Sequence, residues 1–281
     1  QLTALPDSLG RLTQLQTLNL SANQLTALPD SLGRLTQLQM LNLSANQLTA
    51  LPDTLGRLTQ LQTLDLLGNQ LTALPDSLGQ LTQLQTLNLS YNQLTALPDS
   101  LGNLTLLRSM GLRGNPLSEL PDSLGRVPGK VDILNELALL HYEQYKFDEA
   151  IKVFEQVLAI DPRNEFSLRM RILSFRVSGR FKEAQNAIGQ ALNRLPNNTA
   201  ILYERAFLHY DQAEYPAAIL VFERILELEP ENDIALRWRI SSLRKQGSYE
   251  KASSSAKQAL EKFRTTDLLE EQGWVAFDQD Q

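Results

Sequence analysis

The 281-residue chain contains no cysteine, only two histidines and few aromatic residues. Without cysteine, these residues cannot form disulfide bonds, thiolate nucleophiles or iron–sulfur clusters, and the usual ligands of structural zinc are missing. Two histidines leave little material for general-base catalysis or for metal binding. No apolar run approaches the ~20 residues that a membrane-spanning helix needs. We therefore predict no enzyme activity, no cofactor, no metal site and no membrane association.

Basic residues are fewer than acidic residues, 26 against 32, and the net charge is −6. A nucleic acid would find no bulk attraction, so we predict no nucleic-acid partner. The lack of cysteine and of a signal-like start favours a cytoplasmic location. The chain opens inside a repeated pattern at Gln1, so we expect it to be a piece of a longer protein.

A 23-residue repeat fills the first half of the chain. The segment QLTALPDSLGRLTQLQTLNLSAN, residues 1–23, returns almost unchanged three times, and a divergent copy and a half copy follow up to Val127. Each copy contains the pattern L-x-x-L-x-L-x-x-N-x-L. The pattern resembles the leucine-rich repeat family, and LPDSLG resembles its short LPxxL variety of bacteria and plants.

This pattern predicts one solenoid coil per copy. Leu41 and Leu43 are two residues apart, so both face one side of a short strand. The resemblance implies that Asn46 and its equivalents form an internal ladder of bonds to backbone groups of neighbouring coils. The proline of each LPDSLG segment is expected to start a convex turn or short helix, which the following aspartate would cap. A calcium ladder on these aspartates is the alternative, but Ca²⁺ requires six to eight oxygen ligands.

A different repeat, of 34 residues, follows Pro128–Gly129. Each copy has leucine at position 4 and alanine at position 20, and apolar residues recur at helical spacing. The pattern resembles the tetratricopeptide repeat family. Position 11 holds His141 and His209, which we expect to pack between helices. The fourth copy has Arg264 where proline is expected, so we predict that the array ends there.

We predict three regions: leucine-rich repeats in 1–127, four tetratricopeptide repeats in 131–266, and a capping helix or acidic tail in 267–281. In the cap, Leu268, Leu269 and Trp274 would cover the last helix pair. The fold class is a repeat solenoid, an α/β leucine-rich horseshoe followed by an all-α superhelix. Only Arg126–Lys130 joins the two arrays, so we expect the next helix, with Ile133, Leu134 and Leu137, to cap the last coil. One continuous rigid array would result.

Candidate binding residues are those expected to line the concave surfaces. The leucine-rich face is small and polar, and it offers three residues of the types that dominate protein interfaces. These are Tyr91, Arg108 and Arg113. In the tetratricopeptide family the inner-helix positions 2, 5, 9 and 12 line the groove, and here arginine and aromatic side chains prevail. The candidates are Tyr142, Arg169, Arg176, Tyr203, Phe207, Tyr210, Arg237 and Arg244.

An arginine-rich groove favours an acidic or carboxylate-bearing peptide, because arginine pairs with carboxylates in a bidentate manner. The alternative is that the same arginines bind glutamates of the chain or its acidic tail, Asp278–Gln281. The main hypothesis is thus a non-catalytic scaffold that binds a protein or peptide. A regulatory fragment of a larger signalling or effector enzyme and a self-assembling structural module stay open, and the sequence does not determine the oligomeric state.

Overall fold

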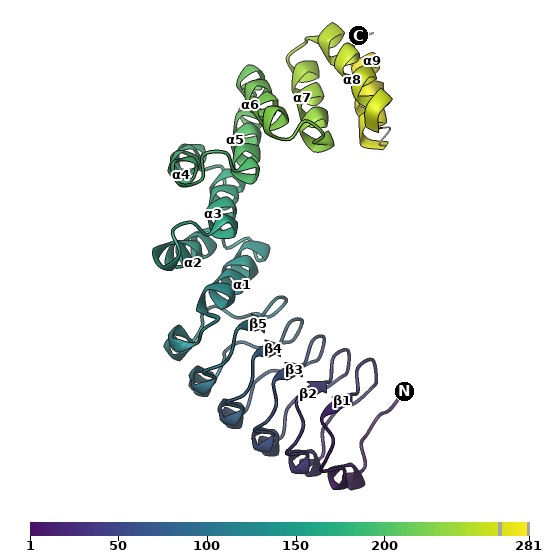
Figure 1. Cartoon of the computed structure of the whole chain (residues 1–281), viewed down its shortest axis with the longest axis vertical. Helices are drawn as coiled ribbons and strands as arrows, with labels where there is room; N and C mark the ends of the chain where they lie inside the picture. The colour runs from purple at the N-terminus through teal and green to yellow at the C-terminus, as the bar shows by residue number, and fades with distance from the viewer. Residues whose placement is uncertain (264–265, 280–281) are drawn as a thin grey trace. The chain divides into compact units, whose positions relative to one another are not determined.

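The computed structural model describes residues 1–263 and 266–279, and these form two compact units, Gln1–Asp161 and Pro162–Gln281 (Figure 1). Arg264, the predicted end of the helical array, and the last two residues of the predicted acidic tail lie outside the described residues. The boundary between the units falls inside the predicted tetratricopeptide array. The prediction of one rigid array over the whole chain stays a prediction.

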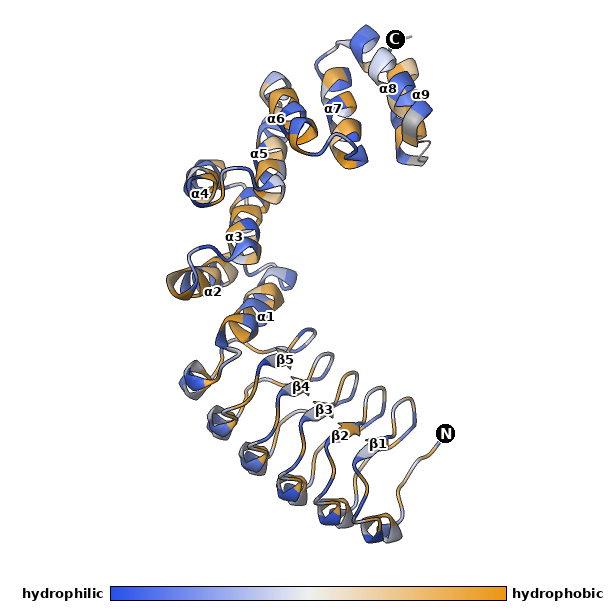
Figure 2. Cartoon of the chain, viewed as in Figure 1, coloured by the Kyte–Doolittle hydropathy of each residue, from blue (hydrophilic) through white to orange (hydrophobic). Residues whose placement is uncertain are grey.

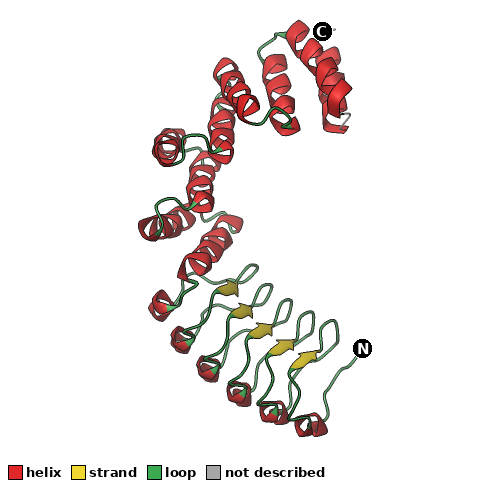
Figure 3. Ribbon diagram, in the orientation of Figure 1, coloured by secondary structure: helices red, strands yellow, loops and turns green. Residues whose placement is uncertain are grey.

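Five short parallel strands form one sheet in the first unit, one strand for each 23-residue copy (Figure 3). The strands are β1 (Thr17–Asn19), β2 (Met40–Asn42), β3 (Thr63–Asp65), β4 (Thr86–Asn88) and β5 (Ser109–Gly111). Residues 23 apart are paired in register, as in Leu18 with Leu41 and Leu41 with Leu64. The inward leucines form a continuous core, and Leu41, Leu43 and Leu64 are fully buried.

The asparagine ladder predicted from the leucine-rich pattern is present. The Asn69 side chain donates to the backbone carbonyls of Leu43 and Leu66 at 3.0 and 3.1 Å, and its oxygen accepts from the backbone N–H of Leu48 at 3.0 Å. Asn46, Asn92 and Asn115 make the same three kinds of bond. The ladder satisfies buried backbone groups that the short strands leave unpaired.

The convex side of each coil carries a five-residue 3₁₀ helix. These helices are Asp7–Arg11, Asp30–Arg34, Asp53–Arg57, Asp76–Gln80, Asp99–Asn103 and Asp122–Arg126. The preceding proline, in extended backbone, occupies the capping position, and no side chain caps the helix. The predicted capping role of the aspartates was therefore wrong. Each aspartate is the first residue of its helix, where its charge faces the positive end of the helix dipole.

A glycine column on the convex side determines how closely the coils approach one another. A Cβ atom added to Gly33 or Gly56 would lie 2.4 Å from the backbone oxygen of the next coil, on Thr54 or Ser77. Any side chain here would push the coils apart, because backbone atoms cannot yield as a flexible side chain can.

Two helices complete the first unit, α1 (Lys130–Glu143) and α2 (Phe147–Ile160). Ile133, Leu134 and Leu137 of α1 are buried, and α1 contacts β5 and the last 3₁₀ helix. The chain enters α1 through Gly129, whose backbone N–H donates to Leu107 of the last complete coil at 2.9 Å. The prediction that this helix caps the last leucine-rich coil is confirmed.

Helical hairpins make up the second unit (Figure 1). Its helices are α3 (Glu165–Val177), α4 (Phe181–Arg194), α5 (Thr199–Asp211), α6 (Tyr215–Leu228), α7 (Asp233–Lys245), α8 (Tyr249–Phe263) and α9 (Thr266–Gln279). Asn164, Asn198 and Asn232 begin α3, α5 and α7, because each side-chain oxygen accepts a backbone N–H from the first turn. Gly179 and Gly247 turn two of the hairpins with positive φ.

Apolar residues of paired helices form the core of this unit, and Figure 2 shows apolar and polar segments alternating along the helices. One cluster joins α5, α6 and α7 around Ala206, Phe222 and Ala235. The last helix, α9, buries Leu268 and Val275 against α7 and α8. Leu269 and Trp274, which were expected to cover the last pair, are exposed, so that detail of the cap prediction was wrong.

Candidate functional site

Every second helix of the Pro162–Gln281 unit contributes to one face, which we call the inner-helix face. It comprises the candidate residues on α3, α5 and α7, and α9 continues it; α3 contacts α5, and α7 contacts α9. The candidates are Arg169, Arg176, Tyr203, Phe207, Tyr210, Arg237 and Arg244. Their spacing of seven residues within a helix places Arg169 and Arg176, and likewise Arg237 and Arg244, on one side of their helices.

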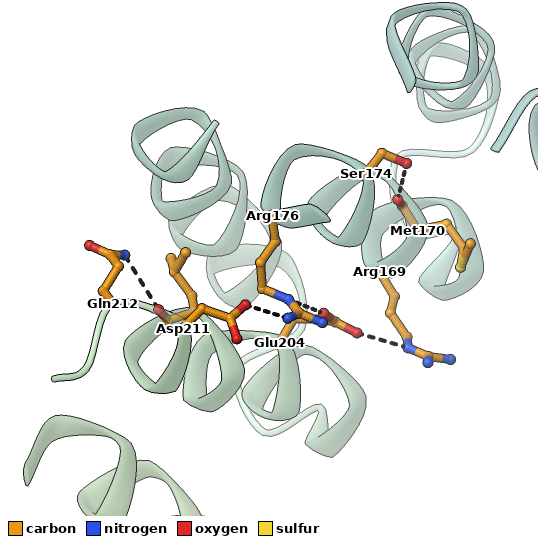
Figure 4. Close-up of polar contacts among 8 residues, drawn as sticks. Arg169, Met170, Ser174, Arg176, Glu204, Asp211 and Gln212 are labelled. Atoms are coloured by element: carbon orange, nitrogen blue, oxygen red, sulfur yellow. Dashed lines mark hydrogen bonds and ion pairs between the residues drawn. The ribbon is translucent and has the colours of Figure 1, made fainter. Parts of the chain in front are cut away.

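A buried carboxylate joins the first arginine pair (Figure 4). Glu204 of α5 is 3% exposed, and its two oxygens lie 3.3 Å from the Nε atoms of Arg169 and Arg176. Arg176 also pairs with Asp211 at 2.6 Å, and its guanidinium lies 5.4 Å from the centre of the Phe207 ring. Arg176 is 16% exposed and Arg169 is 47% exposed, so the same carboxylate has one enclosed and one open partner.

Burial raises the pKa of the Glu204 carboxyl, and the two guanidinium groups oppose that effect. A carboxylate removed from water loses hydration, and only close positive charges and hydrogen bonds compensate for the loss. The arginines therefore support an ionised Glu204, which in turn fixes the position of both guanidinium groups.

The second arginine pair contacts acidic residues of α9. Arg237 pairs with Asp267, and Arg244 pairs with Asp278 at 2.6 Å and lies 3.5 Å from Glu271. Burial raises the pKa of Glu271, against the attraction of Arg244. The four candidate arginines of the inner-helix face thus all have carboxylate partners within the chain, which is the alternative that the sequence left open. Asp278 belongs to the predicted acidic tail.

Aromatic rings fill the space between the two arginine pairs. Tyr203 stacks on Phe207 with ring centres 5.8 Å apart. Trp238 of α7 makes T-shaped contacts with Phe207 and Tyr210, with ring centres 5.0 and 5.2 Å apart. The Tyr203 hydroxyl donates to the side-chain oxygen of Asn232, the residue that caps α7. Burial raises the pKa of Tyr203 to about 12, so the hydroxyl remains protonated. These rings fix the spacing between neighbouring inner helices.

The remaining candidates belong to the Gln1–Asp161 unit. Tyr142 packs edge-on against Phe147 within the α1–α2 hairpin. The exposed Tyr91 and Arg113 lie on neighbouring coils, and the Tyr91 backbone donates to the Arg113 carbonyl. Arg113 pairs with Glu143 of α1 at 2.8 Å. Arg108 is exposed and precedes β5, so it lies at the opposite end of that strand from Arg113.

Polar residues on the outward side of the strands bond mainly to their own backbone. The side-chain oxygens of Asn42, Asp65 and Asn88 each accept a backbone N–H two residues later, at 2.9 to 3.1 Å. This repeated turn occupies groups that a partner would otherwise use, so the strand face offers few groups for recognition.

Sequence reasoning overlooked Glu204 and Trp238. The sequence did contain a signal for Glu204. Glu204 and Asp211 are seven residues apart, like Arg169 and Arg176, and they lie 28 and 35 residues after Arg176. His141 is buried, as a packing residue should be, whereas His209 is partly buried and contacts Glu214 at 2.7 Å. Across the part of the chain that the structure describes, no three His, Asp or Glu side chains gather where a metal could bind. No described helix is long and apolar enough to cross a membrane.

The fold and the site define a solenoid of stacked repeats with a charged and aromatic inner-helix face. A family model for the leucine-rich repeat matches residues 1–48, and a second model, for a leucine-rich repeat region, matches residues 30–150. A family model for the tetratricopeptide repeat matches residues 178–238. The chain carries leucine-rich repeats in its N-terminal part and a tetratricopeptide repeat in its C-terminal part.

Among curated proteins, subunit 2-A of the ER membrane protein complex from Xenopus laevis is 22% identical over 105 residues. That match covers 37% of this chain and 35% of the relative, so the chain spans about a third of its length. Among solved structures, a tetratricopeptide repeat protein from Parabacteroides merdae is 21% identical, with a TM-score of 0.48 and coverage of 54% of this chain and 60% of that one. A leucine-rich repeat protein from Leptospira interrogans is 33% identical, with a TM-score of 0.38 and coverage of 50% and 45%.

Proposed function

We propose that this chain is a non-catalytic scaffold that binds an acidic peptide segment on the inner-helix face. Leucine-rich and tetratricopeptide repeats are typically protein-interaction modules, and their stacked repeats hold side chains at fixed spacing. Little conformational entropy is then lost when a peptide binds, because the receptor side is already ordered.

The intramolecular ion pairs restrict which arginine can receive such a peptide. Arg176 and Arg244 are mostly enclosed and hold two carboxylates each. Arg169 is the open member of the set: Glu204 contacts its Nε, while its two terminal nitrogens point away from that carboxylate (Figure 4). A guanidinium held at Nε with its end exposed can pair with an incoming carboxylate through both terminal nitrogens.

The observation that carries the proposal is this orientation of Arg169 by a buried carboxylate. Phe166 lies one turn earlier on α3 and is also exposed, so an apolar contact lies beside the charged one. A peptide with an acidic residue close to an apolar residue is the ligand that this surface suits best.

The test is fluorescence anisotropy with a labelled 15-residue peptide of alternating glutamate and leucine, and with the same peptide carrying lysine for glutamate. We expect Arg169→Met to weaken binding of the acidic peptide about tenfold or more. Arg224→Met is the matched control, because Arg224 is as exposed but lies on α6 and pairs with Glu227. Equal affinity of wild type and Arg169→Met would refute the proposal. A glutamate at position 169 would be a poor test, since it would face Glu204.

A further inference from the structure

The last helix repeats the pattern of α5 at a constant offset of 67 residues. Leu268 and Val275 of α9 occupy the positions of Ile201 and Leu208, and all four side chains are buried. The buried sides of the two helices are therefore equivalent.

The acidic residues obey the same offset. Glu271 and Asp278 correspond to Glu204 and Asp211. Arg244 lies 3.5 Å from Glu271 and 2.6 Å from Asp278. Arg176 lies at nearly the same distances, 3.3 and 2.6 Å, from Glu204 and Asp211. The ion pairs thus seat α9 on α7 in the manner in which α5 sits on α3. By these contacts α9 is the inner helix of a further repeat.

The other side of the two helices differs sharply in burial. Leu202 of α5 is 5% exposed and Ala206 is fully buried. Their counterparts on α9 are Leu269, which is 55% exposed, and Gly273, which is exposed. Trp274 and Phe277, which correspond to Phe207 and Tyr210, are also more than half exposed. Three large apolar side chains therefore line the uncovered side of α9.

In the equivalent position α6 covers α5, and Trp238 of α7 also contacts Phe207 and Tyr210. Phe222 of α6 makes a T-shaped contact with Phe207, and Tyr215 makes one with Tyr210, with ring centres 5.9 and 5.5 Å apart. Ala218 lies in the same cluster, where its small side chain lets the two helices approach closely. An α6-like helix is therefore the element whose shape this face fits.

We propose that Leu269, Trp274 and Phe277 form a docking surface for an amphipathic helix of a partner polypeptide, seated on α9 as α6 is seated on α5. The partner helix presents an aromatic and alanine seam. Three carboxylates of α9 pair with arginines of α7, but Glu270 is exposed and lies one turn before Trp274. The partner helix is therefore basic on the flank that meets Glu270. Residues 266–279 contain no basic side chain, so a second copy of α9 would offer Glu270 no opposite charge, which disfavours that occupant.

The probe is a synthetic peptide of residues 213–230, which contain α6, carrying Glu223→Lys and Glu227→Lys. Both glutamates are exposed in the chain, so the seam is unchanged and only the flanks become basic. We expect saturable binding to the full chain in anisotropy, and weaker binding of the unmodified peptide.

Trp274→Ala and Leu269→Asp should each reduce the affinity for the basic peptide about tenfold or more, because aromatic anchors dominate such interfaces. Leu220→Ala is the matched control, because Leu220 is also an exposed apolar residue but lies on α6. Melting temperatures of all variants should stay close to that of the wild type, since the changed side chains face solvent.

Two results would overturn the proposal. The first is absence of binding, or binding that Trp274→Ala leaves unchanged. The second is a wild-type chain that dimerises in sedimentation analysis and loses the dimer on Trp274→Ala, since a second copy would then be the occupant. Loss of this surface leaves Arg169 intact, so failure here does not decide the acidic-peptide proposal.

Discussion

Arg169 and Arg176 contact the same buried carboxylate at the same distance, yet we expect their removal to have very different effects on stability. Both Nε atoms lie 3.3 Å from Glu204, but Arg176 is enclosed and Arg169 is half exposed. Methionine is a suitable replacement for both, because its unbranched chain retains part of the packing of the arginine stem.

Arg176→Met should reduce the free energy of unfolding by about 3 kcal/mol at pH 7.5, because it leaves a buried carboxylate with one solvated partner. The variant also loses the ion pair with Asp211 and the contact with Phe207. Arg169→Met should cost less than about 1 kcal/mol, since solvent already screens that ion pair.

The pH dependence distinguishes a charge effect from a packing effect. Burial raises the pKa of Glu204, and removal of Arg176 raises it further in the folded state. A carboxyl whose folded pKa exceeds its unfolded pKa stabilises the fold below the unfolded pKa, and that contribution is lost as the pH rises through the folded pKa. The deficit of Arg176→Met should therefore shrink as the pH falls from 7.5 towards 4.5.

Urea unfolding followed by circular dichroism at several pH values measures these free energies. Adding Glu204→Gln to Arg176→Met should restore part of the loss, because the orphaned charge is then removed. Equal costs for the two arginine variants, or a deficit that does not change with pH, would refute the reasoning.

Asn69→Ala should lower the free energy of unfolding by about 3 kcal/mol, because it breaks three buried hydrogen bonds. Asn23→Ala, at the more exposed first coil, should lower it by about 1 kcal/mol. Urea unfolding measures both, and equal losses would contradict the role of the ladder. Gly56→Ala should destabilise by about 2 kcal/mol through its clash with the next coil, and Gly189→Ala, in open space on α4, should stabilise by up to about 1 kcal/mol; thermal melts of the two variants check the opposite signs. Burial lowers the pKa of His141, so the unfolded chain takes up its proton more readily, and stability should fall as the pH drops below 6.5 towards the folded pKa. His141→Gln should flatten this part of the pH–stability curve, and an unchanged curve would assign the effect to other groups.

The periodic features of the fold were predictable from the sequence because their causes are local. Leu41 and Leu43 must share a strand face, and a proline before each five-residue 3₁₀ helix has a fixed φ and no N–H to leave unpaired. Asn46 and its equivalents recur at one phase of the repeat, which made the ladder predictable from family resemblance. The capping of the last coil by Ile133 and its neighbours followed from the short junction.

The tertiary structure decided which partner each charged side chain has, how deeply it is buried, and which apolar side chains remain exposed. The partners of Arg176 lie 28 and 35 residues away, and only helix packing determines that Glu204 is buried and Arg169 is not. Composition alone showed 26 basic and 32 acidic residues, so it was compatible both with arginines open to a partner and with arginines paired to carboxylates of the chain. The exposure of Trp274 was likewise hidden, because an amphipathic pattern reveals an apolar face but does not reveal what packs against it.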